Sequence, residues 1–119
     1  MQRCMSIAFA LLLTAPVIAQ GQATIPDQFR GKWASSQAKC GVPSESSLAI
    51  DADRFDSSES RGRVLLVKVV SKREIEVELE LSGEGQVWRT TRRFGLSEDG
   101  RSLTDLTTRD HQTTRVRCQ

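Results

Sequence analysis

The chain has 119 residues, which is enough for one small domain. Its 17 Lys and Arg residues nearly balance its 15 Asp and Glu residues, and its 38% hydrophobic content is typical of a folded globular protein rather than of a disordered chain. No apolar run reaches the roughly 18 to 20 residues that a membrane-spanning helix needs, so we expect no stable membrane anchor.

The first 19 residues have the order of a secretory signal peptide. A positively charged start at residues 1–3 precedes an apolar run at 7–13 and a small-residue ending at 17–19. We expect cleavage after Ala19, with residues 21–23 as a second possible site. A buried N-terminal helix of the folded domain is the alternative. The signal predicts a periplasmic or secreted protein.

Residues 20–25 lack periodicity, which predicts a flexible arm before a single domain over residues 26–119. One short helical turn is expected ahead of a first strand at 31–34. The aromatic side chains of this region, Phe29 and Trp33, are expected to plug one end of the core.

Two loops are predicted around the second strand. Residues 35–47 contain Gly, Pro and five serines and are predicted to form a loop. Residues 48–53 alternate apolar and polar side chains, which is typical of a half-buried strand. Residues 54–62 are rich in Ser and Asp and are predicted to form the second loop.

The strongest structural signal lies at residues 74–81, where apolar residues alternate strictly with glutamates. Only a strand places all the apolar residues on one face, with the glutamates on the solvent face. The apolar, β-branched run at 64–70 precedes it, and residues 71–73 match a hairpin connection, so the two strands should pair antiparallel. The glutamates are Glu74, Glu76, Glu78 and Glu80, and their expected cross-strand partners are Lys68, Arg89 and Arg93.

Further strands are predicted at residues 86–96, 102–108 and 113–118, separated by turns rich in Gly, Ser and Asp. The chain thus holds about seven short strands and no helix pattern longer than one turn. This spacing predicts an all-β fold, an antiparallel meander closed into a small barrel.

Cys40 and Cys118 are the two cysteines that remain after the predicted signal. In an oxidising compartment two cysteines permit one intramolecular bridge, and we predict a disulfide between them. A reactive or metal-binding thiol pair is the alternative, but the pair lacks the C-x-x-C spacing of such sites.

Catalytic chemistry finds little support in the residues. The single histidine, His111, falls in a predicted turn, and no serine lies in a G-x-S-x-G elbow. The acidic residues between 51 and 59 lack the order of a calcium loop, and the glutamate row is more simply a solvent face than a paired-carboxylate site. We therefore expect no enzyme activity, no cofactor and no metal.

Arginine and tryptophan gather in the segment 86–96, which is the best candidate for contact with a ligand or partner. The candidate residues are Trp88, Arg89, Arg92 and Arg93. Such a face resembles a binding surface for single-stranded nucleic acid, but the net charge of only +2 and the predicted export argue against that partner. If Arg92 points into the barrel it needs a carboxylate, a ring or an anionic ligand, and pairing with Asp105 or Trp33 is favoured.

The segment Gly31-Lys32-Trp33 opens the first strand of this predicted barrel and resembles the Gly-x-Trp signature of lipocalin-like (calycin) proteins. In that family the tryptophan closes the barrel floor and packs against an arginine from the last strand. The resemblance implies that Arg115 or Arg117 fills that role here.

Other positions fit the resemblance in part. Thr104-Asp105 resembles a fragment of the second lipocalin motif, with Leu106 in place of the expected tyrosine. Bacterial periplasmic inhibitors of secreted metalloproteases are similar in size and barrel type, but their cysteine spacing is short, unlike that from Cys40 to Cys118. The resemblance covers six or so residues and implies an architecture, with no ligand and no active site.

The composition leaves three functional hypotheses. The first is an exported, non-enzymatic binding module for a protein or for a small apolar or anionic ligand. The second is an inhibitor of a secreted hydrolase of the protease or lysozyme class, which would insert residues 20–25 or 35–47. The third, an enzyme, lacks a catalytic set. A ligand carrier needs a cavity of a few hundred cubic ångströms, and the few aromatic residues favour a packed core and a protein partner.

Overall fold

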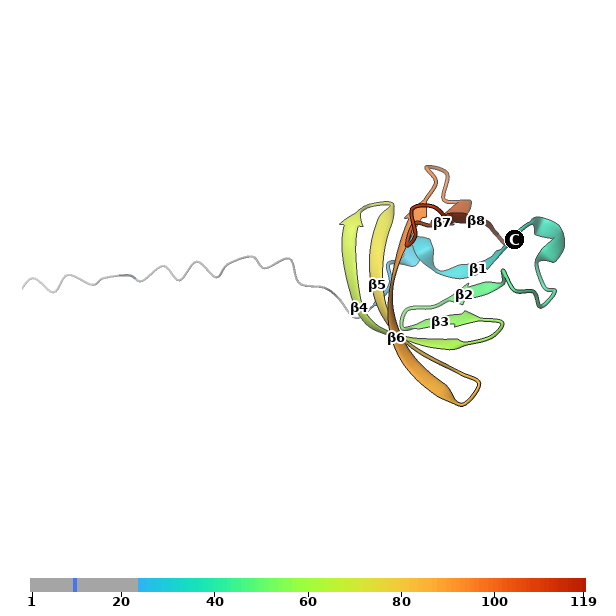
Figure 1. Cartoon of the computed structure of the whole chain (residues 1–119). Helices are drawn as coiled ribbons and strands as arrows, with labels where there is room; N and C mark the ends of the chain where they lie inside the picture. Colours follow the sequence, from blue (N-terminus) through green and yellow to red (C-terminus); the bar gives the residue numbers. More distant parts are fainter. Residues whose placement is uncertain (1–9, 11–23) are drawn as a thin grey trace, which may run out of the picture.

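The computed structural model describes Ala10 and residues 24–119, so the predicted signal peptide and residues 20–23 of the predicted arm lie outside the described part apart from Ala10. Residues 24–119 form a closed barrel in which each of eight antiparallel strands pairs with the next and the last pairs with the first (Figure 1). The predicted all-β meander barrel is confirmed. The strands are β1 (Gly31–Ala34), β2 (Leu48–Ile50), β3 (Arg54–Ser57), β4 (Arg61–Ser71), β5 (Glu74–Gly83), β6 (Gln86–Leu96), β7 (Ser102–Asp105) and β8 (Thr113–Arg117).

The loop predicted at residues 54–62 is wrong, because β3 occupies its first half and makes eight strands in place of about seven. β3 has one buried side chain, Phe55, and therefore shows no apolar alternation. Pairing on both sides makes it a strand, with Phe55 opposite Ile50 of β2 and Gly62 of β4. A Cβ atom on Gly62 would lie 2.5 Å from the Phe55 carbonyl oxygen, so glycine allows the two strands to approach.

Strands β4, β5 and β6 are the longest and form one strongly paired wall of the barrel (Figure 1). The apolar residues of β5 are buried in the core, and the glutamates alternate with them on the outer face. Arg93 forms an ion pair with Glu74 at 3.3 Å, and Arg63 forms one with Glu80 at 3.4 Å. Such half-exposed pairs contribute about 1 kcal/mol at most.

One end of the barrel is closed by η1 (Asp27–Phe29), a single 3₁₀ turn, together with the first strand. Phe29 and Trp33 are fully buried here, and the Trp33 indole N–H donates to the Phe29 carbonyl oxygen at 3.1 Å. Ile25, the last residue of the predicted arm, is also buried, and its N–H donates to the Ala52 carbonyl at 2.8 Å. The packed core therefore begins one residue ahead of the predicted domain boundary.

Arg117 fastens this closed end. Its guanidinium carbon lies 4.3 Å from the centre of the Trp33 ring, which is a cation–π distance. The same guanidinium donates to the backbone carbonyls of Arg30 at 2.6 Å and Gly100 at 3.0 Å, and to that of Gln28. One side chain of β8 thus joins the first strand, the turn before it and the turn before β7.

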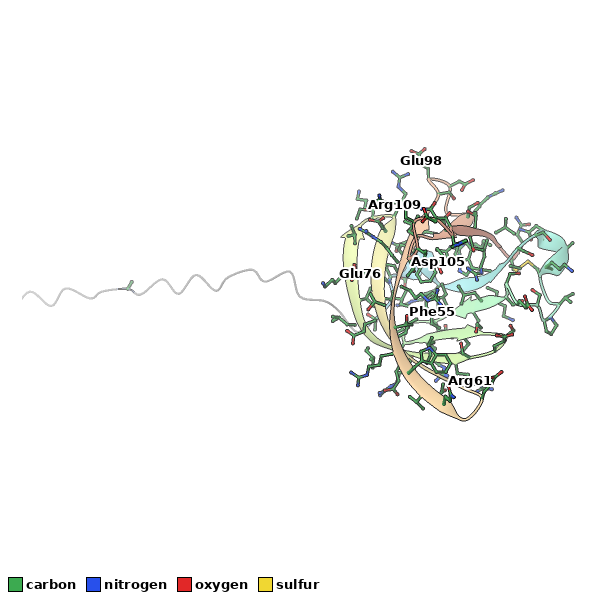
Figure 2. All side chains as sticks on the ribbon, viewed as in Figure 1. Phe55, Arg61, Glu76, Glu98, Asp105 and Arg109 are labelled. Atoms are coloured by element: carbon green, nitrogen blue, oxygen red, sulfur yellow. A yellow bond between two sulfur atoms is a disulfide. The ribbon has the colours of Figure 1, made fainter. Side chains whose placement is uncertain are left out.

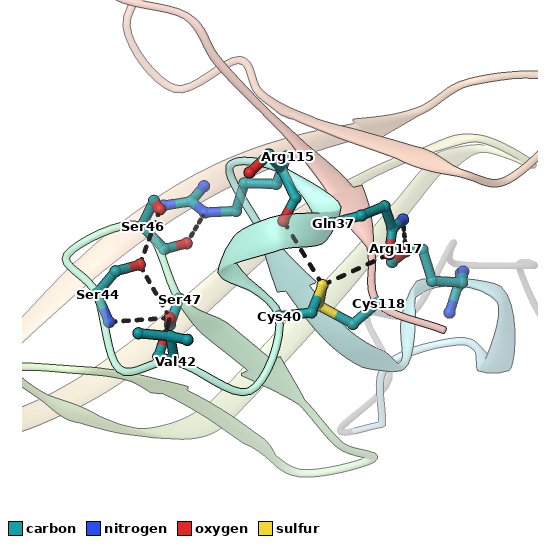
Figure 3. The surroundings of a disulfide bond; sticks show 10 residues. Gln37, Cys40, Val42, Ser44, Ser46, Ser47, Arg115, Arg117 and Cys118 are labelled. Atoms are coloured by element: carbon teal, nitrogen blue, oxygen red, sulfur yellow. Dashed lines mark hydrogen bonds between the residues drawn. A yellow bond between two sulfur atoms is a disulfide. The ribbon is translucent and has the colours of Figure 1, made fainter.

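The predicted disulfide between Cys40 and Cys118 is confirmed, with 5.5 Å between the two Cα atoms (Figure 3). It ties the end of η2 (Gln37–Lys39), a second 3₁₀ turn, to the residue that follows β8. The seam between β1 and β8 has only two residue pairs, so the bridge reinforces the weakest junction of the barrel.

Candidate functional site

The end of the barrel opposite Trp33 is its open end, which we call the mouth. The side-chain amide of Gln28 donates to the carbonyl of Lys72, so the closed end lies at the turn between β4 and β5. The mouth lies at the other end of β5, beside the turn into β6. It holds a cavity of about 90 Å³, lined by Leu48, Phe55, Ser57, Ser60, Leu79, Leu81, Arg92, Phe94, Asp105 and Arg115.

Arg92 points into this cavity from β6 and is paired with Asp105, which ends β7. The distance from Arg92 Nη1 to Asp105 Oδ2 is 3.3 Å, and the Asp105 side chain is only 15% exposed. Phe55 and Asp105 both lie within the barrel beside β6 (Figure 2). Of the two partners considered for Arg92, the structure selects Asp105, because Arg117 covers the Trp33 ring.

Arg115 is the second arginine of the mouth. Its Nε–H donates to the backbone carbonyl of Ser46 at 2.7 Å. Burial lowers the pKa of Arg115, the Asp105 carboxylate opposes this effect, and the nearby Arg92 charge adds to it. A guanidinium nevertheless stays charged at physiological pH. Two positive charges therefore share one carboxylate in the mouth, which leaves a net positive charge there.

The β5–β6 hairpin projects beyond the mouth (Figure 1). It presents apolar side chains to solvent. Val87 is 69% exposed and Trp88 is 41% exposed. Trp88 and Arg92 border a hollow of about 330 Å³ that adjoins the cavity. The other lining residues of the hollow are Ser57, Glu59, Ser60, Leu81, Gly83, Glu84 and Gln86.

The four candidate contact residues of β6 fall on two faces of the strand. Trp88 and Arg92 lie opposite Leu81 and Val77 of β5, whose side chains face the interior. Arg89 and Arg93 lie opposite Glu80 and Glu76 on the outer wall. The structure therefore brings Trp88 and Arg92 together at the mouth and separates them from the other two.

The serines of the mouth are the residues that sequence reasoning missed. Ser57 and Ser60 lie in the segment predicted as loop, and their hydroxyl groups hydrogen-bond each other at 2.9 Å across the turn from β3 to β4. Their placement depends on the pairing of β3, for which the sequence carries only the weak signal of Phe55.

The loop at residues 35–47 lies beside strands β1 to β3 and is fastened at several points (Figure 3). Besides the disulfide, Gln37 donates to the Arg117 carbonyl at 2.7 Å, and Arg115 holds Ser46. A shallow hollow of about 320 Å³ lies between this loop and strands β1 to β3, next to Val42, which is half exposed.

In residues 24–119 no three or more His, Cys, Asp or Glu side chains gather so that they would hold a metal ion. His111 is exposed in the connection between β7 and β8. Among the same residues no helix has the length and apolarity to cross a bilayer.

Comparison of the chain with models of protein families, with curated proteins and with solved structures found no match. The protein is therefore classified by its fold and site geometry only. It is a small, closed, antiparallel β-barrel with one disulfide and a positively charged mouth. The likeness to lipocalin-like proteins stays a prediction from Gly31-Lys32-Trp33.

Proposed function

We propose that this chain is an exported, non-enzymatic binding module whose partner is a protein that contacts the mouth. The observation that carries this proposal is the packed interior. Cavities that enclose small molecules measure about 300–1,000 Å³ and are mostly apolar, whereas the cavity within the barrel measures about 90 Å³ and the adjoining hollow of about 330 Å³ is lined mostly by polar residues. The remaining inward space is filled by fourteen buried apolar side chains of a single core.

The surface of the mouth supports a protein partner. Tryptophan and arginine are the residues most enriched at energetic hot spots of protein interfaces. Trp88 stands exposed beside Arg92, and the adjoining hollow is open to solvent. A partner side chain that fills this hollow would cover the Trp88 ring and contact Arg92.

Export is part of the proposal and rests on two observations. The first 19 residues have the order of a signal peptide. The disulfide joins the only two cysteines that lie beyond that segment, and disulfides persist in oxidising compartments. A periplasmic or secreted location agrees with both.

Inhibition of a secreted hydrolase is the second candidate function, and the loop at residues 35–47 favours it. The loop is held by Cys40, Gln37 and Ser46, and it exposes Val42. A segment that is fixed before binding loses little conformational entropy when it enters a partner's cleft. In this alternative the contact surface is the outer wall rather than the mouth.

Site-specific photo-cross-linking tests which surface the partner contacts. A benzophenone amino acid at Val87 should give a discrete covalent adduct with a protein in the organism that encodes the chain. The matched control is Val70, which has a comparable exposed apolar side chain (47%) but lies on β4 near the closed end. We expect no adduct from position 70.

The outcomes separate the hypotheses. An adduct from Val42 without one from Val87 would favour the inhibitor and overturn the mouth as the contact surface. A small molecule that stays bound to the purified protein in native mass spectrometry, with no adduct from either position, would overturn the protein partner.

A further inference from the structure

Strand β6 has an open edge at the mouth. It pairs with β5 along its whole length, from Gln86 to Gly95, but with β7 only from Phe94 to Leu96. Within the described part of the chain, no strand pairs with the other edge of residues 86–92. Residues 86–89 are all exposed and only Thr90 and Arg92 are half-buried, so this edge is accessible to a partner.

The hydrogen bonds at Arg93 reveal which backbone groups face this edge. The Arg93 carbonyl accepts the Leu106 N–H at 2.7 Å, and the Arg93 N–H donates to Thr107 Oγ1 at 2.9 Å. Both groups of Arg93 therefore point away from β5. Because this direction alternates along a strand, the N–H and carbonyl groups of Val87, Arg89 and Thr91 also point away from β5. The open edge therefore presents the backbone N–H and carbonyl groups of three alternate residues.

The edge is vacant because β7 leaves it. Leu106 and Thr107 still bond to Arg93, and Asp105 Oδ1 accepts the Thr107 N–H at 2.9 Å in the turn that takes the chain away from β6 after these two residues. Proteins commonly protect open edges with proline, bulges or charged side chains. Residues 86–92 contain neither proline nor glycine, and charge is their single protective device.

We propose that this edge binds an extended, acidic segment of the partner protein as an added ninth strand. The inference rests on the proposed function and names the chemistry of the partner. Strand β6 carries three arginines and no Asp or Glu. Two of them have carboxylate partners, while Arg89 forms no ion pair within the described residues, and neither does Arg115 beside the edge.

A second copy of this chain is a poor occupant. Two such edges paired together would bring Arg89 and Arg92 of both copies close to one another, and like charges on neighbouring strands are destabilising. An acidic strand would instead place negative charges beside these arginines. Its backbone would complete the hydrogen bonds of Val87, Arg89 and Thr91, its outer carboxylates would face Arg89, and its inner side chains would adjoin Trp88 and Arg92.

The test uses NMR of the folded protein with a defined probe, an end-capped eight-residue peptide that alternates glutamate and valine. We expect amide exchange to slow about tenfold or more at Val87, Arg89 and Thr91 when the peptide saturates the protein. Exchange at Thr90, whose N–H faces β5, should stay unchanged. Unchanged exchange at all three edge residues, or no binding at about millimolar peptide, would overturn the proposal.

Two peptide controls separate strand pairing from charge attraction. The same peptide with an N-methyl group on every residue keeps its charges but loses all backbone donors, so it should not bind. A peptide with lysine in place of glutamate should also not bind. Equal binding of the N-methylated and parent peptides would overturn strand addition.

Protein variants test the same edge. Thr91→Pro removes an edge N–H that takes no part in the pairing with β5, and it should abolish binding, while Thr91→Val should bind like the wild type. Arg89→Glu should weaken binding about tenfold. If position 87 still cross-links to a protein in the Thr91→Pro variant, the partner is a protein but it does not bind as an added strand. If position 87 gives no cross-link in the otherwise unchanged chain, the proposed function itself is overturned.

Discussion

Removal of the disulfide should destabilise the domain and open the barrel at one seam. The perturbation is the double substitution Cys40→Ser with Cys118→Ser, which leaves no free thiol in the described part of the chain. The two cysteines are 78 residues apart in sequence. On the chain-entropy estimate, a loop of this length restricts the unfolded state by about 4.5 kcal/mol.

This magnitude is large for so small a domain, because total stabilities are about 5–15 kcal/mol. A loss of 1 kcal/mol lowers the Tm of a domain of this size by about 4–8 °C, so the variant should melt about 20 °C or more below the wild type. The native state should also change unevenly. Only two residue pairs join β1 to β8, whereas ten join β5 to β6, so the β1–β8 seam should open first.

Calorimetry and hydrogen exchange measure the two effects. We expect a lower Tm, together with faster amide exchange at Ala34 and Val116 than at Val77 and Leu79. A Tm equal to that of the oxidised wild type would refute the entropic argument. Equal acceleration of exchange in all strands would refute the seam as the point of opening.

Three further predictions concern single side chains. Trp33→Ala should cost about 3–5 kcal/mol in urea unfolding, because it leaves a cavity against Phe29; wild-type stability would contradict the plug. Arg117→Lys keeps the charge over the indole but not the bonds to three carbonyls, so a loss of about 1–2 kcal/mol is expected, and none would show those bonds to be unimportant. The Ser97 hydroxyl lowers the pKa of Asp99, so Ser97→Ala should raise that pKa towards 3.8 in a carbon NMR titration. A lowered native pKa means that the Asp99 carboxylate stabilises the fold above pH 3.8 and loses this effect as the pH falls through the native pKa, and an unchanged titration in Ser97→Ala would refute the assignment.

The parts of the fold that local pattern determines could be predicted from the sequence. The alternation of residues 74–81 corresponds to a strand with a buried face, because each side-chain direction is set by the strand itself. The disulfide followed from the count of cysteines. Strand β3 could not be predicted, because its one buried residue, Phe55, becomes a core residue only through partners on two other strands.

The sequence pattern overestimated the lengths of two strands. The strand predicted at residues 48–53 ends at Ile50, and the strand predicted at 102–108 ends at Asp105. Residues 106–108 are compatible with a strand, so propensity gives no stop signal there, whereas Asp51 and Asp53 already disfavour one. Strand β7 ends near the bond from the Thr107 N–H to Asp105 Oδ1, and β2 ends where the Asp51 N–H donates to the Arg54 carbonyl in the turn to β3.

The candidate site shows the same division between local and distant causes. Trp88 and Arg92 share a face because they are four residues apart on one strand, and the sequence suffices for that. The second arginine of the mouth, Arg115, was considered only as a partner for Trp33, and the structure gives that place to Arg117. Two arginines that lie two residues apart on one strand look equivalent in sequence, but Arg117 lies opposite Trp33 of β1 and Arg115 lies opposite Leu103 of β7.

Asp105 connects the mouth with the open edge of β6. One carboxylate oxygen accepts a hydrogen bond from Arg92, and the other accepts the N–H of Thr107 and turns the chain out of the sheet. Asp105 thus holds Arg92 at the mouth and ends β7, the strand that would otherwise pair with residues 86–92 of β6. Because β6 is eleven residues long and β7 is four, the vacancy is a direct result of where this carboxylate stops β7. The charge of the site and its unpaired backbone therefore have a common structural cause.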